Sequence, residues 1–599
     1  MDSYRHNKII LAFLERKTMD VMRTLFMTII MISITSAVFA NDSAALRKLF
    51  AEERQGLYKE NPATNPNRKG PVRQMGKVRP ADYERRAKHA AKFIEKLRTI
   101  NRSELSAEDK INYDLFLHIK KDQQLDYKLQ TYRIPFYSDS GFHSYLPRMW
   151  RNTRFASRID YEAYLDRIAD IERYFNDHIA NMRMGIKDGF TMPRVVLDGL
   201  LPTFSSPIKN DPTKSEFYGP FHKMVEDMSE KDKNELRAMA KDVIVKKVMA
   251  AYKKLAAFMK DEYYPAARTD LGAYKLPNGK EYYQSMVNYY TTLDISPEEI
   301  HETGKREVAR IRAEMEEIIR NVKFKGSFTD FLEFLRTDPQ FYAKSEKELL
   351  MHACYIAKKA DGRLPRLFKH MPRQPYGVEA VPASIAPNYT TGRYVGAPLN
   401  APRGGYYWVN THALDKRPLY NLPALTLHEA VPGHHFQIAL SKEMKNVPEF
   451  RKGYYPHAYG EGWGLYSEKL GIELDIYETP YEHFGRLSYE MWRACRLVID
   501  TGIHAKGWSR EKAIAMLEEN SALSTHNIRT EVDRYISWPG QALSYKMGEL
   551  KILELRKRAT EKLGKKFDLR EFHAKILMAG GLPLTLLERQ VDEWIASYQ

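Results

Sequence analysis

Apolar residues recur at intervals of three and four along nearly the whole chain from about residue 43. In an α-helix this spacing places the apolar side chains on one face, where they can pack against neighbouring helices. The clearest segments are 81–99, 159–182, 233–259, 298–320 and 345–360. One helix start is well marked, because Ser296, Pro297 and Glu299 form the pattern of a capping box. The sequence therefore predicts a mainly α-helical fold.

Residues 371–411 interrupt this pattern with six prolines. The end of the region, residues 404–410, is rich in aromatic and branched side chains, as is typical of a β-strand. Such a strand either belongs to a small structural sheet or lines a cleft and pairs with an extended peptide. In the second case Asn410, at its end, is a candidate to bind the substrate backbone.

The composition, with 43% hydrophobic and 29% charged residues, is ordinary for a soluble globular protein. The two cysteines, Cys354 and Cys495, do not form a CxxC pair, so neither a disulfide framework nor a sulfur-ligated metal is expected. A chain of 599 residues is long enough for several domains. We expect a signal peptide over residues 1–40, an N-terminal helical subdomain over 41–290 and a catalytic subdomain over 291–599.

The first residues resemble a secretory signal. Arg23 precedes a short apolar run over residues 25–34, and small residues lead to a cleavage site after Ala40. The run is too short to span a membrane comfortably, and no Cys follows it to carry a lipid anchor. We expect a periplasmic or secreted protein without a stable membrane span after cleavage; an uncleaved anchor is the alternative. Met19 and Met22 are both plausible true starts.

The net charge of +17 is spread along the chain, without a basic arm or a recognisable nucleic-acid-binding motif. A generally basic surface explains it, as does attraction to an anionic cell wall or membrane. No nucleic-acid partner is expected. The sequence indicates no oligomeric state.

The stretch from Leu427 to Gln437 contains the candidate metal-binding and catalytic residues. His428 and a following His can ligate a catalytic zinc that keeps one position open, and Glu429 lies where a metallopeptidase has its general base. The following histidines come six and seven positions later. In a straight helix the first points about 120° away, and the second lies about 10.5 Å along the axis. Neither suits chelation.

Pro432 and Gly433 offer a solution. Pro432 lacks the amide that would bond to the carbonyl of His428, and Gly433 permits a tight backbone. A bulge that absorbs two residues would bring His434 to the position of the second ligand. His434 is therefore favoured over His435, and the other imidazole is expected to contact the substrate or to support a metal ligand.

The third metal ligand is expected from a later helix that begins near Glu461. Gly462 and Gly464 would let this helix approach the metal-binding helix closely. We assign Glu461 as the ligand and Glu468 as a hydrogen-bond partner of a ligand His. The alternative is that both are solvated acids, but Trp463 makes the segment look buried.

Residues 428–437 (HEAVPGHHFQ) and 461–468 (EGWGLYSE) resemble the bacterial domain-of-unknown-function 885 family, which is grouped with zincin-like peptidases of the MA clan. The resemblance covers nearly all of the chain after the signal peptide, including residues 539–552. It implies a large helical zincin-like fold with a deep cleft and a small β-sheet beside the metal-binding helix. Angiotensin-converting enzyme and the thermostable carboxypeptidases have such folds. In the more distant dipeptidyl-peptidase III the motif also carries inserted residues, which favours His434 as the second ligand.

An oxyanion donor is expected in the C-terminal part of the chain, where His504 and Tyr545 are the candidates. The segment around Tyr545 resembles the tyrosine-bearing segments of related helical peptidases. Arg534 and Gln541 are candidates to hold the substrate, in the case of Arg534 through a terminal carboxylate. Each of these residues could instead be packed in the core.

Together these features predict an exported, Zn²⁺-dependent metallopeptidase that hydrolyses short peptides. Zinc acidifies a bound water and polarises the scissile carbonyl, and Glu429 would take the proton and pass it to the leaving amine. Two alternatives stay open: a non-catalytic metal- or peptide-binding protein on the same scaffold, and a cell-wall peptide amidase. The sequence does not distinguish exopeptidase from dipeptidase action.

Overall fold

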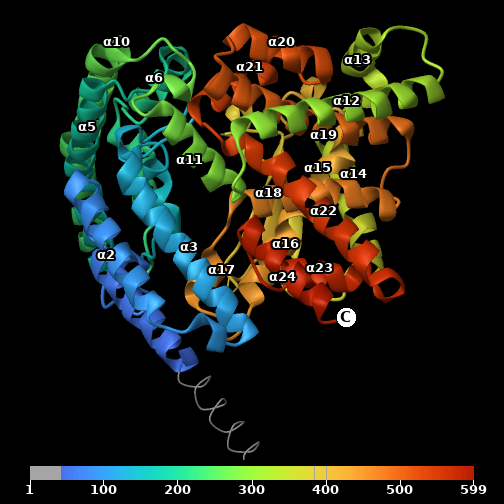
Figure 1. Cartoon of the computed structure of the whole chain (residues 1–599). Helices are drawn as coiled ribbons and strands as arrows, with labels where there is room; N and C mark the ends of the chain where they lie inside the picture. Colours follow the sequence, from blue (N-terminus) through green and yellow to red (C-terminus); the bar gives the residue numbers. More distant parts are fainter. Residues whose placement is uncertain (1–41, 384, 400, 599) are drawn as a thin grey trace, which may run out of the picture. The chain divides into compact units, whose positions relative to one another are not determined.

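The structure, a computed structural model, describes residues 42–383, 385–399 and 401–598 (Figure 1). In this part the chain is mainly α-helical, with one small sheet, as the sequence predicts. The deep cleft expected from the family resemblance stays a prediction. The expected signal peptide over residues 1–40 lies outside the described residues.

The contacts divide the chain into two units. In the described residues the first unit consists of 42–69 and Glu84–Leu125, and the second of Gly70–Tyr83 and 126–598. The expected change of subdomain near residue 290 stays a prediction.

The first unit is helical. It comprises a helix over 42–60, most of α2 (Pro80–Arg98) and most of α3 (Ala107–Leu129). The rings of Phe50 and Phe116 lie 5.0 Å apart, and Lys120 forms a buried ion pair with Glu53. A buried cation of this kind is tolerated because its carboxylate partner is buried with it.

The second unit contains the remaining helices. These are α4 (Arg158–Ala169), α5 (Ile171–Asp188), α6 (Leu197–Ser205), α7 (Gly219–His222), α8 (Glu230–Val243), α9 (Ala250–Phe258), α10 (Tyr264–Ala266), α11 (Gly279–Thr291), α12 (Pro297–Asn321), α13 (Phe328–Thr337), α14 (Glu346–Arg363), α15 (Leu422–Glu429), α16 (His434–Glu443), α17 (Glu449–Gly453), α18 (His457–Glu473), α19 (Pro480–Lys506), α20 (Arg510–Asn520), α21 (Thr525–Ser537), α22 (Ser544–Leu563), α23 (Leu569–Leu577) and α24 (Leu584–Ala596).

The periodic segments predicted from the sequence are helical, with two interruptions. Segment 159–182 divides at Asp170 into α4 and α5, and segment 233–259 contains a π-helical turn over Ile244–Met249. The predicted start of α12 is confirmed. Ser296 caps the helix, and its backbone N–H donates to the carboxylate of Glu299 at 3.0 Å.

Helix α19 is buried along most of its length and packs against α12, α15 and α22 (Figure 1). Helix α18 is likewise buried and crosses α22 closely. At the crossing a Cβ on Gly462 would lie 2.4 Å from the Cα of Gly548, so both helices need glycine there. The Gly462 of the motif therefore permits the contact with α22 rather than the approach to the metal-binding helix.

The sheet has three strands, β1 (Tyr376–Ala380), β2 (Gly392–Val395) and β3 (Gly405–Val409), in the order β1-β3-β2. Strand β3 pairs parallel with β1 and antiparallel with β2. The strand predicted over 404–410 is thus confirmed. However, it lies in the middle of the sheet, and its two neighbours already use its hydrogen-bonding edges. An extended peptide cannot pair with it, which favours the small structural sheet of the two alternatives; the free edge beside α15 belongs to β2.

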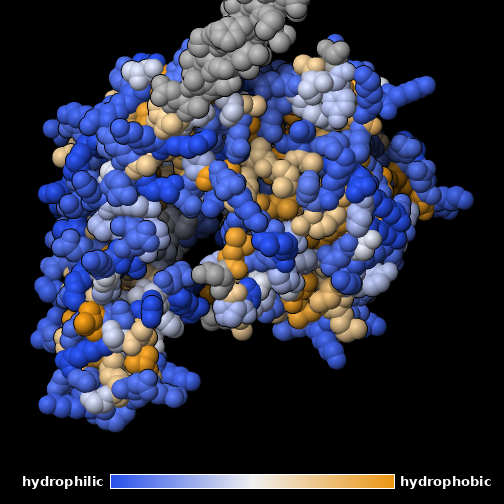
Figure 2. All heavy atoms as spheres, turned by 90° about the horizontal axis from the view of Figure 1, so that it is seen from below, coloured by the Kyte–Doolittle hydropathy of each residue, from blue (hydrophilic) through white to orange (hydrophobic). Residues whose placement is uncertain are grey.

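The surface is largely hydrophilic on the face drawn in Figure 2, with hydrophobic residues in small groups. Among the described residues, none of the helices is long and apolar enough to cross a bilayer.

The carboxyl group of Asp500, fully buried in α19, makes stability depend on pH. It accepts hydrogen bonds from the Tyr283 hydroxyl at 2.6 Å and from the Gly540 N–H at 3.1 Å. Burial raises the pKa of Asp500 from 3.8 to about 7. Because the folded pKa lies above the unfolded one, this contribution to stability is complete below about pH 4 and is lost as the pH rises through about 7.

We predict that Asp500→Asn makes stability less dependent on pH. Between pH 5 and 8 the wild-type protein should lose about 3 kcal/mol more than the variant, because ionised Asp500 is costly to bury. Urea denaturation at the two pH values measures the difference. Asp294→Asn, at an exposed position, is the control and should behave as wild type. An equal loss in Asp500→Asn and wild type would contradict the assignment.

Candidate metal centre

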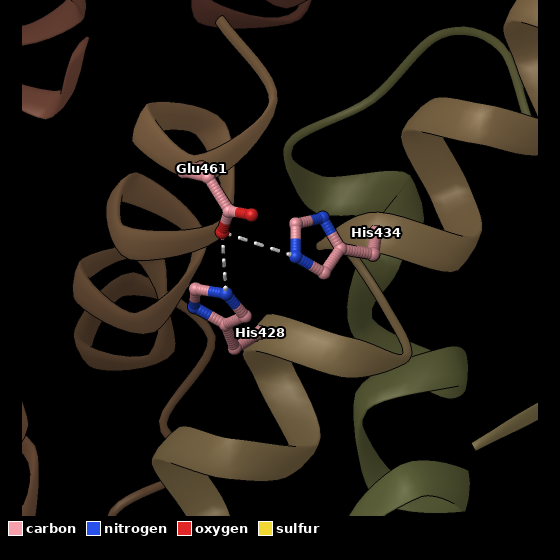
Figure 3. Close-up of side chains that lie close together, drawn as sticks. All are labelled: His428, His434 and Glu461. Carbon is pink, nitrogen blue, oxygen red and sulfur yellow. Dashed lines mark ion pairs between the residues drawn. The ribbon is translucent and has the colours of Figure 1, made fainter. Parts of the chain in front are cut away.

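Three side chains from three helices converge at one point (Figure 3). The Nε2 atoms of His428 and His434 lie 3.6 and 3.5 Å from the same carboxylate oxygen of Glu461. One ligand atom from each residue lies within 4.8 Å of the other two. His428 comes from α15, His434 from α16 and Glu461 from α18.

The chain reaches this geometry by ending one helix and starting another. Helix α15 ends at Glu429 and α16 begins at His434, so the expected bulge within one helix is in fact a complete break. A Cβ on Gly433 would lie 1.9 Å from the carbonyl oxygen of His428, which requires glycine at this position. The indole N–H of Trp463 donates to the carbonyl of Pro432 at 2.7 Å and thereby fixes the turn. The break turns His434 back toward His428.

Helix α18 fits around the first imidazole. A Cβ on Gly464 would lie only 2.6 Å from Cε1 of His428, so the absence of a side chain makes room for the ring. Glu461 lies three residues before Gly464 and Glu468 four residues after it, which places all three on one face of the helix. One face of α18 thus carries the candidate ligand Glu461, the gap at Gly464 that receives the ring of His428, and Glu468.

Each ligand histidine is oriented through its other ring nitrogen. Nδ1 of His428 is 2.8 Å from Oε1 of Glu468, and Nδ1 of His434 is 3.4 Å from the hydroxyl of Tyr455. Arg493 lies 3.6 Å from the same oxygen of Glu468. Such partners fix which nitrogen faces the centre and increase its basicity as a ligand. Both Nε2 atoms therefore face Glu461.

The electrostatics of the centre follow from burial and mutual contact. Burial opposes protonation of His428, but its contacts with Glu461 and Glu468 raise its pKa to about 10. Burial likewise opposes ionisation of Glu461, yet the two histidines hold its pKa well below the usual 4.5. The carboxylate thus keeps its negative charge, as a metal ligand requires, whereas His428 has to lose its proton before it can bind an ion.

The ligand set fits zinc. Two imidazoles and one carboxylate form the three-ligand set of a catalytic zinc site with one open position. Ligand atoms about 2.0–2.1 Å from a tetrahedral ion lie about 3.4 Å apart. The two distances to Glu461, 3.5 and 3.6 Å, are close to that value.

Glu429 follows His428 at the end of α15 and is only half-buried. Its carboxylate accepts the backbone N–H of Tyr394 at 2.8 Å. Tyr394 belongs to β2. Immediately beyond the ends of β2 and β3, the N–H of Asn410 donates to the carbonyl of Thr391 at 2.9 Å, which continues the antiparallel pairing. Because alternate residues of an edge strand point their backbone groups outward, Gly392 and Tyr394 face away from β3. The free edge of β2 therefore lies at Glu429.

Three predicted residues lie elsewhere. His435 is buried against the sheet, with Nδ1 3.2 Å from the hydroxyl of Tyr394, and burial lowers its pKa to about 4. Asn410 is fully buried and donates to the carbonyls of loop residues such as Ala386, so it cannot anchor a substrate as we expected.

His504 lies in the core and is not brought to the centre. Its Nδ1 accepts the N–H of Ala273 at 3.0 Å, and its Nε2 lies 2.9 Å from the carbonyl of Tyr535. Burial lowers the pKa of His504 to about 3. With both nitrogens bound to backbone groups, the neutral ring joins α19 to its neighbours. The expected role as an oxyanion donor has no geometric support.

The other C-terminal candidates lie together. Arg534 donates to the side-chain oxygen of Gln541 at 2.9 Å and to the hydroxyl of Tyr545 at 3.4 Å. Arg534 lies 5.7 Å from the ring of Trp538, whose centroid is 6.2 Å from that of His457, one helical turn before Glu461. This group is therefore near the centre. The hydrogen bonds of the described residues do not join it to any of the three candidate ligands.

Sequence reasoning missed Tyr455, Arg493 and the backbone of Tyr394. Tyr455 lies six residues before Glu461, and its ring occupies the space above Gly460, where a Cβ would lie 2.0 Å from it. A tyrosine this close in sequence to a candidate ligand is a signal from which its place at the site could have been predicted. Arg493 and the N–H of Tyr394 reach the site from distant segments, and the sequence gives no sign of either.

The comparisons agree with this fold. The model of a family described as "Bacterial protein of unknown function (DUF885)" matches residues 63–591. The chain belongs to this family. The family predicted from the two motif strings is thus confirmed, while the peptidase activity stays a prediction. No curated protein matches the chain.

Two solved structures are similar to this one. The "putative lipoprotein" from Colwellia psychrerythraea is 27% identical, with a TM-score of 0.85, over 93% of this chain and 100% of its own. The "putative lipoprotein of unknown function" from Shewanella oneidensis is 16% identical, with a TM-score of 0.69, over 91% of this chain and 99% of its own. At that identity the second structure shows the shared fold alone.

We predict that Gly464→Ala weakens zinc binding by about 10- to 100-fold, the range seen when the support of a ligand is disturbed. The added methyl group would push the ring of His428 out of position. Competition with a chromophoric chelator measures the affinity. Gly362→Ala in α14 is the control, since its Cβ would meet nothing within 4 Å. Unchanged affinity in Gly464→Ala would show that the ring is not held where we place it.

Proposed function

We propose that this protein is a zinc-dependent metallopeptidase that hydrolyses short peptides. The observation that carries the proposal is the convergence of His428, His434 and Glu461, with the half-buried Glu429 next to His428 in the sequence. The ligand set leaves one position open, which distinguishes catalytic from structural zinc sites. A free carboxylate next to that position is the further requirement for peptide hydrolysis.

The three ligands would hold the ion, which when bound supplies Lewis acidity at the open position. Glu429 then has the role of general base: it accepts a proton at its free oxygen and delivers it to the leaving amine. The N–H of Tyr394 holds the other oxygen, Oε2, and so orients the carboxylate. Tyr545 is a candidate to donate a hydrogen bond to the developing oxyanion, because its hydroxyl contacts Arg534, which reaches toward the centre over Trp538.

The edge of β2 is the element best placed to hold an extended substrate. The N–H of Tyr394 is bonded to Glu429, but the carbonyl of Tyr394 and the backbone groups of Gly392 also point outward there, and a peptide can add to such an edge by main-chain hydrogen bonds. This replaces β3 and Asn410 of the sequence-based expectation. Binding through the backbone accepts many side chains, which suits a peptidase of broad preference.

We further propose that the protein acts outside the cytoplasm. The signal-like segment before Asn41 supports export, and the two structurally similar proteins are both named lipoproteins. Periplasmic and secreted locations fit equally.

We predict that Glu429→Gln keeps bound zinc but lowers kcat by about 10²–10⁴-fold, the usual contribution of a general base. A chelator should abolish wild-type hydrolysis, and added zinc should restore it. The measurement is mass-spectrometric product analysis of a peptide mixture, together with zinc content. Peptide binding without cleavage by the zinc-loaded wild-type protein would contradict the proposal and favour a non-catalytic binding protein.

A further inference from the structure

Two arginines lie in a buried cluster where α19, α21 and α22 meet. Arg496, only 2% exposed, donates to a carboxylate oxygen of Glu531 at 2.8 Å and to the hydroxyl of Tyr535 at 2.9 Å. Arg534, whose side chain is 26% exposed, lies 3.6 Å from the other oxygen of Glu531. In the described part of the chain, the two guanidinium groups thus share one carboxylate.

This arrangement leaves an excess positive charge. The remaining neighbours are neutral: the ring of Tyr545 lies 4.4 Å from the guanidinium of Arg496, and Gln541 accepts from Arg534. Nη1 of Arg496 is buried without a hydrogen-bond partner in the described residues. A buried cation that lacks its own anion is costly, and a ligand that brings an anion removes the cost. The partly exposed fork of Arg534 matches the geometry of a carboxylate.

A series of ring contacts joins the cluster to the candidate metal centre. His457 lies one helical turn before Glu461 on α18, and its ring centroid lies 6.2 Å from that of Trp538, over which Arg534 lies at 5.7 Å. Tyr455 forms a second link, because its hydroxyl touches His434 and its ring centroid lies 6.3 Å from that of His457. These contacts connect Arg534 with the candidate centre over the length of a short peptide.

Aromatic rings line the space around His457. Its ring centroid lies 5.2 Å from that of Tyr290, 6.2 Å from that of Trp538 and 6.3 Å from that of Tyr455. Arg534 lies 5.7 Å above Trp538. Tyr455 keeps 37% of its surface exposed, and Nδ1 of His457 is buried without a hydrogen-bond partner in the described residues. Rings beside a cation suit a ligand that carries an apolar side chain next to its anion.

We propose that Arg534, supported by the charge of Arg496, binds the free C-terminal carboxylate of the substrate, and that Tyr290, Tyr455 and Trp538 receive its last side chain. The inference rests on the proposed peptidase function and names its substrate class. The substrates are short peptides with a free C-terminus and an aromatic or large apolar final residue, cleaved close to that end.

The first test compares two peptides of one sequence ending in Phe, one with a free carboxylate and one amidated. The wild-type protein should prefer the free acid, and Arg534→Gln should lower kcat/KM for the acid by about 10- to 100-fold through a higher KM. The amide should be affected little. Arg529→Gln, an exposed position on the same helix, is the matched control and should keep the preference. Equal cleavage of acid and amide by the wild-type protein would overturn the inference and leave the proposed function intact.

The second test measures binding without catalysis, by calorimetry on the metal-free protein. N-acetylphenylalanine should bind and its amide should not, and Arg534→Gln should lose this binding while Arg529→Gln keeps it. Trp538→Ala should reduce the preference for N-acetylphenylalanine over N-acetylalanine. If Arg534→Gln does not fold, Arg534→Lys keeps the charge without the planar fork and should bind the acid several-fold more weakly. Equal binding of acid and amide would overturn the inference. Selective binding of the acid by a protein that cleaves no peptide would support the site and contradict the proposed function alone.

Discussion

The packing of one imidazole against one glycine determines the geometry of the candidate site. The ring of His428 fills the space over Gly464, which sets how closely α15 and α18 can approach. At that separation Glu461 faces one ring nitrogen and Glu468 the other. A larger residue at 464 would separate the helices and move both carboxylates out of reach. The ligand, its support and the contact between the helices thus depend on a single van der Waals fit.

Local signals in the sequence were sufficient for the helices and for most of the ligand set. The helical period, the capping box at Ser296 and the spacing of the acids on 461–468 depend on residues close in sequence, and the structure agrees with each of them. His434 was favoured because Pro432 and Gly433 disrupt a helix. The same residues led us to expect a bulge, whereas the helix ends. The difference arises from Trp463, whose indole N–H binds the carbonyl of Pro432 from another helix.

The wrong predictions of residue roles have a common physical cause. The roles of Asn410, His435 and His504 depend on which backbone or hydroxyl groups lie opposite them after folding. A polar side chain in a motif looks functional until those partners are known. The sequence does not show whether its hydrogen bonds are satisfied in the core or whether it is free to bind a ligand. Strand order is another such property: the pattern over 404–410 predicts a strand but does not show that β3 has neighbours on both sides.

Helix α19 connects the candidate metal centre with the arginine cluster. Arg493 meets Glu468, which supports a metal ligand, and Arg496 meets Glu531 in the cluster. The two arginines lie three residues apart, about 4.5 Å along the helix axis. The ring of Trp492 lies 4.5 Å from each guanidinium and holds both in place. Since a buried helix is stiff, α19 fixes the spacing between Arg493, beside the candidate metal centre, and Arg496, in the arginine cluster. Under the proposed function this fixed spacing would limit the length of peptide beyond the cleaved bond.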